Sequence, residues 1–74
     1  MHLVIQGADI ETRDLKALAK LSGASAIDRL ADSAFRLRGA QPAAGIAEHC
    51  ASAKLDHGFV PEGRRLSDFG LLVM

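Results

Sequence analysis

The chain has 74 residues, of which 49% are hydrophobic and 24% charged, with nine basic residues against nine acidic ones. This length accommodates one small domain and a tail. The net charge of zero disfavours a protein that binds nucleic acid or an anionic membrane, because both rely on excess positive charge. Cys50 is the single cysteine, so no internal disulfide forms, and a reducing, cytoplasmic location is expected.

The first part of the chain predicts a strand followed by a helix. Residues 2–6 are mostly β-branched or apolar and end at Gly7, as is typical of a short strand. Residues 12–22 are predicted to form an amphipathic helix, with Thr12 as its N-cap and Gly23 just beyond its C-terminus. The apolar residues of this helix recur at helical spacing, namely Leu15, Leu18 and Leu21.

The next part of the chain predicts a β-hairpin. Residues 26–30 form an extended segment with imperfect alternation, which is consistent with a β-bulge, and residues 31–33 are turn-forming. Residues 35–38 alternate cleanly, which gives the hairpin one buried and one solvated face. The apolar pair Phe35 and Leu37 is expected on one face, and the basic pair Arg36 and Arg38 on the other.

A second helix and a last strand complete the predicted domain. Residues 43–55 carry small and apolar residues at helical spacing, and Pro42 suits a first helical turn. Residues 58–60 are a strand candidate that Pro61 closes. The order strand, helix, strand, strand, helix, strand predicts a ferredoxin-like α+β fold, with two helices on one face of a four-stranded antiparallel sheet. The other face of the sheet would be open.

The last residues differ in composition from the predicted domain, which spans residues 1–61. Residues 62–68 are polar and are interpreted as a linker. Residues 69–74 form an apolar run that is typical of the start of a strand buried on both faces. We therefore expect the chain to be the front piece of a longer protein, with residues 69–74 frayed in the absence of their own sheet.

Few residues are candidates for chemistry. The histidines (His2, His49 and His57) show no zinc-type spacing, and the adjacent His49 and Cys50 point about 100° apart on a helix. We expect ordinary surface or half-buried histidines, a small core residue at Cys50, and neither a metal site nor a catalytic residue. A small enzyme that uses Cys50 as its nucleophile is the least favoured hypothesis, because no base is evident beside it.

Two binding hypotheses remain open from the residues alone. Gly7 and Asp9 lie between the first strand and the first helix, where free backbone N–H groups could hold the carboxylate of an amino acid; an ordinary turn is the competing interpretation. Arg36 and Arg38 on an open sheet face suggest an RNA-binding module as the alternative. RNA binding of this kind needs stacking aromatics, and the chain has three Phe but no Tyr or Trp. A solvated or protein-paired face is therefore favoured.

Residues 60–74, with the sequence VPEGRRLSDFGLLVM, resemble the junction in bacterial phosphoserine phosphatases between an amino-terminal ACT-like domain and a catalytic domain of the haloacid dehalogenase superfamily. In that family an apolar strand ending in Met precedes an Asp-Xaa-Asp-Xaa-Thr motif whose first Asp is the nucleophile. The resemblance extends to the first strand and helix, and it implies that the nucleophile would follow Met74.

This resemblance implies a function for the longer protein and a different one for the present chain. The longer protein would hydrolyse O-phospho-L-serine to L-serine and phosphate with Mg²⁺, in serine biosynthesis. The chain itself would be a non-catalytic regulatory or dimerisation domain without a cofactor. Its implied partners are its own catalytic domain, a second copy of the chain and a free amino acid such as L-serine, but neither nucleic acid nor membrane.

Overall fold

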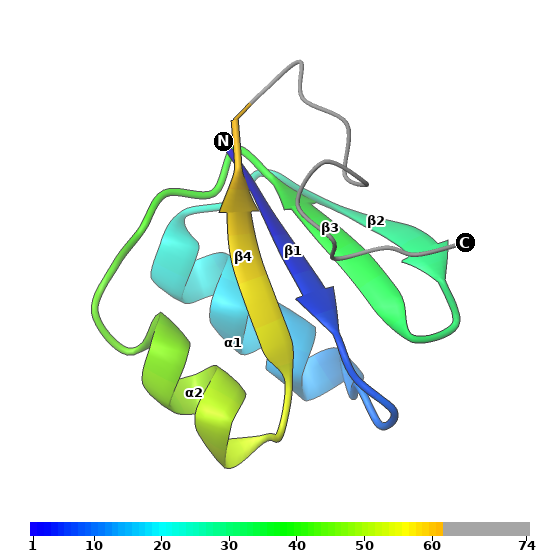
Figure 1. Ribbon diagram of the computed structural model, residues 1–74. Helices are drawn as coiled ribbons and strands as arrows, with labels where there is room; N and C mark the ends of the chain where they lie inside the picture. Colours follow the sequence, from blue (N-terminus) through cyan, green and yellow to red (C-terminus); the bar gives the residue numbers. More distant parts are fainter. Residues whose placement is uncertain (62–74) are drawn as a thin grey trace.

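The computed structural model describes residues 1–61 (Figure 1). The elements follow in the order β1 (His2–Gln6), α1 (Thr12–Ser22), β2 (Ala26–Ala31), β3 (Ala34–Arg38), α2 (Ile46–Ser52) and β4 (Asp56–Val60). The strands form one sheet in the order β2-β3-β1-β4, and every neighbouring pair is antiparallel. This arrangement confirms the predicted ferredoxin-like α+β fold. The predicted linker, residues 62–68, and the apolar run, residues 69–74, lie outside the described residues.

The hydrophobic core lies between the two helices and the face of the sheet that they cover (Figure 1). Alternation along β1 and β3 turns every second side chain toward the helices, so that Leu3 of β1 lies opposite Leu37 of β3. The apolar residues of the two helices form the other half of the core, because their spacing places them on one side of each helix. Its buried members are Leu3, Ile5, Leu15, Leu18, Leu37, Ala40, Ile46, Cys50 and Leu55.

Helix α1 has the predicted bounds but a different N-cap. Glu11, in extended backbone conformation, precedes the helix, and the predicted cap Thr12 is its first helical residue. Glu11 takes this place because its backbone N–H donates to the Asp14 carboxylate at 3.3 Å, as in a capping box. Gly23 ends the helix at φ 72° as predicted, whereas Leu21 is 41% exposed rather than part of the core.

Helix α2 is shorter than predicted at both ends. It begins at Ile46 and not at residue 43, because Gly45 has the left-handed φ of 91° and no helix can propagate through that conformation. The prediction that Pro42 starts a helical turn is therefore wrong. At the other end Lys54 has a φ of 58°, so the backbone leaves the helix before Leu55.

The predicted strands are confirmed, and three of their boundaries change. β2 extends to Ala31, β3 begins at Ala34, and β4 begins at Asp56 rather than at residue 58. The pairing of β2 with β3 shifts register between Arg29 and Ala31, which confirms the predicted irregularity in this strand. Among the described residues, no helix is both long and apolar enough to span a membrane.

Candidate functional site

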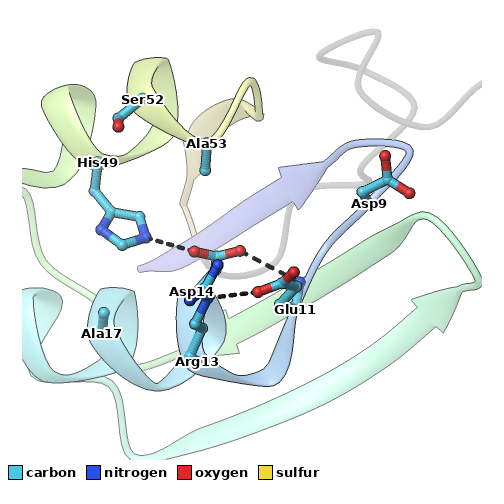
Figure 2. A pocket seen from close by; sticks show the side chains of 8 residues that line it. All are labelled: Asp9, Glu11, Arg13, Asp14, Ala17, His49, Ser52 and Ala53. Atoms are coloured by element: carbon cyan, nitrogen blue, oxygen red, sulfur yellow. Dashed lines mark hydrogen bonds and ion pairs between the residues drawn. The ribbon is translucent and has the colours of Figure 1, made fainter.

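A cavity of about 540 Å³ lies between the start of α1 and the second half of α2. Figure 2 shows that its side chains come from the two helices and from the connection that precedes α1. The lining residues are Asp9, Glu11, Arg13, Asp14, Ala17, His49, Ser52 and Ala53. Charged groups of both signs and an imidazole therefore share one small, open space, and this makes the cavity the candidate site.

The two helices are joined at this cavity by a contact between Asp14 and His49. The Nε2 atom of His49 lies 3.0 Å from the Asp14 Oδ1 atom. The Asp14 side chain is 13% exposed and that of His49 is 29% exposed, so water screens the contact only in part. An ionised carboxylate only accepts hydrogen bonds, so with Asp14 ionised the hydrogen bond runs from an N–H group at His49 Nε2 to the Asp14 oxygen.

Helix periodicity explains why these two side chains meet. Asp14 precedes the buried Leu15 in the first turn of α1, so it lies at the border of the apolar stripe. His49 has the same place on α2, one residue before the buried Cys50 and three after Ile46. Packing of the apolar stripes against the sheet thus brings the two border residues together. Because 35 positions separate the two residues, no local sequence pattern predicts that they are in contact.

Three other charged residues line the outer part of the cavity. The Arg13 guanidinium pairs with the Glu11 carboxylate, and their side chains are 83% and 55% exposed. Asp9 is exposed in the connection before α1, and no hydrogen bond or ion pair involves its side chain within residues 1–61. In Figure 2 Asp9 stands apart from the cluster formed by the other acidic residues. A ligand in the cavity would therefore meet an unpaired carboxylate on one side and a paired guanidinium on the other.

The structure separates the two residues that were predicted to bind a ligand. Asp9 lines the cavity, whereas Gly7 does not. The Gly7 N–H donates to the Ser33 carbonyl at 3.0 Å, so this group is already satisfied. A Cβ atom on Gly7 would lie 2.4 Å from the Leu55 Cδ2 atom. Glycine at this position thus allows the connection to pack on the buried Leu55 side chain.

The other residues considered as candidates for metal binding or catalysis lie elsewhere in the fold. His2, on β1, and His57, on β4, are half-buried, and neither lines the cavity. Cys50 is 1% exposed, inside the core. Burial raises the pKa of the Cys50 thiol, and the negative charge of Asp14 raises it further. A raised pKa keeps the sulfur protonated at neutral pH, which is the opposite of what a nucleophilic cysteine needs.

The basic pair of β3 lies on the face of the sheet away from the helices, as predicted, but it is not free. This face is not open as expected, because Val4, which lies opposite Arg36, is fully buried. Arg36 donates to the Asp28 carboxylate at 3.1 Å, and Arg38 contacts the same carboxylate at 2.8 Å. Phe35 and Phe59 pack against the core on the other face. In the described part of the chain, the face away from the helices therefore carries two paired arginines and neither Phe35 nor Phe59.

The described residues do not fit a Mg²⁺ site. Within residues 1–61 no group of three or more His, Cys, Asp or Glu side chains is arranged to hold a metal ion. Mg²⁺ prefers an octahedral shell of oxygen ligands that includes carboxylates. The magnesium chemistry implied for the longer protein is therefore not assigned to any of these residues.

A family model described as a domain of unknown function, DUF4072, matches residues 3–46. The matched segment runs from β1 to the first residue of α2, so it includes Asp9 and Asp14 but stops before His49. No curated protein and no solved structure matches the chain.

The contact between Asp14 and His49 is expected to stabilise the fold measurably. In a double-mutant cycle with Asp14→Asn and His49→Gln, we expect a coupling free energy of about 1 kcal/mol, because a charge-assisted hydrogen bond at the border of the core is lost. Urea unfolding of the four proteins measures it. The matched cycle, Glu11→Gln with Arg13→Gln, should give a coupling near zero, since that pair is exposed. Equal coupling in the two cycles would contradict the account.

Replacement of Gly7 by Ala is expected to destabilise the domain by roughly 1–3 kcal/mol, because the added methyl overlaps the Leu55 side chain. Urea unfolding measures this change in the free energy of unfolding. In a Leu55→Ala background the penalty of Gly7→Ala should largely disappear, because the overlapping atom is gone. A penalty that persists in that background would show that Gly7 has a role other than packing.

Proposed function

Because the chain belongs to the DUF4072 family, whose description assigns no function, we propose a function from its own fold and sequence. The chain is the amino-terminal regulatory and assembly module of a phosphoserine phosphatase, and it has no catalytic role itself. The observation that carries the proposal is the order of the parts. A βαββαβ domain is followed immediately by residues 60–74, the stretch that resembles the entry to the phosphatase catalytic domain.

The composition of the site supports a binding role rather than a catalytic one. Cys50 is buried and protonated, so it is not available as a nucleophile. The imidazole of His49 is hydrogen-bonded to Asp14, and within residues 1–61 no hydroxyl or thiol is hydrogen-bonded to this imidazole. The parts that a regulatory module needs are a small cavity and a surface for assembly. The phosphatase reaction would belong to the catalytic domain that the resemblance implies.

The ligand that we propose for the cavity is a free α-amino acid such as L-serine. Its volume of about 540 Å³ falls within the range of small-molecule pockets, roughly 300–1,000 Å³. An α-amino acid carries an ammonium and a carboxylate close together, and the cavity offers a counterpart for each. The Asp9 carboxylate would bind the ammonium group, and the Arg13 guanidinium would bind the carboxylate by exchanging it for Glu11.

This assignment changes the ligand site predicted from sequence in one respect. The first strand-to-helix connection remains the site, through Asp9, but the side chains of α1 and α2 replace the backbone at Gly7 as the binding groups. L-Serine is the product of the proposed reaction, so its binding to this module would regulate the phosphatase by feedback.

An NMR titration of the chain with L-serine tests the cavity directly. We expect fast-exchange amide shifts concentrated at Asp9, Glu11 and Arg13 at millimolar ligand, because the site is open and its charges are partly hydrated. Asp9→Asn should weaken binding about tenfold, as expected for loss of a charge-assisted hydrogen bond of roughly 1.4 kcal/mol.

Glu48→Gln is the matched control for this titration, since Glu48 is an exposed acid of α2 outside the cavity lining. It makes the same change in net charge and should leave the affinity unaltered. If millimolar L-serine shifts no amide around the cavity, the amino-acid part of the proposal fails and assembly remains as the proposed role.

A further inference from the structure

Two fully buried side chains lie on the face of the sheet away from the helices. Val4 is flanked in β1 by Leu3 and Ile5, which belong to the core, so Val4 points to the opposite side. Val60 follows Phe59, which packs against the core, and Val60 points away from the helices for the same reason. Neither valine has any exposed surface, although neither is part of the core cluster. Something other than the two helices therefore excludes water from these side chains.

The described residues beside the two valines provide little of this cover. Val4 lies between Gly58 of β4, which has no side chain, and Arg36 of β3. The Arg36 guanidinium pairs with Asp28 of β2, on the side away from β1. Val60 lies on β4, an edge strand that within residues 1–61 pairs with β1 alone. Because the outer side of an edge strand is open, both valines would be partly exposed on a bare face.

The same face also holds a buried polar atom without a partner. His2 lies opposite Val60, and its Nδ1 atom is buried with no hydrogen bond to any group of residues 1–61. A buried ring nitrogen that lacks a partner destabilises the fold. A polypeptide backbone offers both a donor and an acceptor at each non-proline residue. The cover that suits this face is therefore a stretch of chain with an apolar side chain and free backbone groups.

Residues 62–68 are the segment best placed to cover this face, because they follow β4 directly. Residues 60–63 have the sequence Val-Pro-Glu-Gly, which suits a β-turn with Pro at its second position and Gly at its fourth. Such a turn would send the chain back across the domain. Strand geometry places Val4 about 8 Å from Val60, and the six residues from Val60 to Leu66 can span this distance after a turn. Leu66 is the one apolar side chain of the segment.

We propose that residues 62–68 fold back across the face of the sheet away from the helices, and that Leu66 covers Val4 and Val60 there. A backbone group of the same segment binds the His2 Nδ1 atom. The inference goes beyond the proposed function: it involves neither the cavity nor phosphoserine, so it holds or fails independently of both. In the longer protein of the proposed function, the docked segment would hold residues 69–74 at a fixed place on the domain.

Paramagnetic relaxation in NMR spectra tests where the segment lies. A nitroxide attached through Ser67→Cys, in the full 74-residue chain, should broaden the amide signals of Val4 and Gly58 several-fold more than that of Glu48, which is exposed on α2. The native Cys50 is buried and should not take up the label. Equal broadening of the three signals, or no broadening, would overturn the proposal.

Two matched variants and a mixing experiment identify the occupant. Leu66→Asp should abolish the preferential broadening at Val4, because a carboxylate does not cover apolar side chains, whereas Leu71→Asp should preserve it. The opposite result would assign the cover to residues 69–74 and refute the proposal. Nitroxide-labelled chains mixed with ¹⁵N-labelled chains that carry no nitroxide should leave the Val4 signal sharp. Broadening in this mixture would show that a second copy covers the face, and it would equally overturn the proposal.

Discussion

Two short helices bury one face of the sheet, and this packing determines where the other features of the domain lie. Every second residue of β1 and β3 faces the helices, and Leu18 and Ile46 fill the space between the layers with almost no exposure. A domain this small buries a modest fraction of its surface, so few of these contacts can be lost. Leu18→Ala alone would be expected to cost roughly 2–5 kcal/mol, a large part of the stability of such a domain.

The candidate site is a consequence of this packing. Because the apolar stripes of α1 and α2 face the sheet, the residues that border them face each other, and Asp14 meets His49 at the edge of the core. The cavity lies beside this contact, between the start of α1 and the second half of α2. The same alternation that builds the core also determines the other face of the sheet. Arg36 and Arg38 lie on that face, and both pair with Asp28.

The spacing of apolar residues and the residues that end helices and strands predicted those parts of the fold that depend on local sequence. The bounds of α1 followed from the leucine spacing and Gly23, and the hairpin followed from the alternation of β3. The sequence predicts the start of α2 wrongly because Pro42 is a good first-turn residue, whereas nothing in the sequence shows that Gly45 adopts a left-handed conformation.

The site was predicted less well than the fold, for a physical reason. Asp9 was identified because it lies in a connection whose position follows from the order of elements. His49 was interpreted as an ordinary half-buried residue, because its partner Asp14 lies on another helix and is brought close only by tertiary packing. The role of Gly7 in contacting Leu55 was hidden for the same reason.

We propose that this domain regulates a phosphoserine phosphatase. The most direct measurement is phosphate release from O-phospho-L-serine, in the presence of Mg²⁺, by a longer polypeptide that begins with residues 1–74. We expect this polypeptide to hydrolyse phosphoserine, and we expect L-serine to affect the rate only while residues 1–61 are present. A longer polypeptide that folds and leaves phosphoserine intact would contradict it.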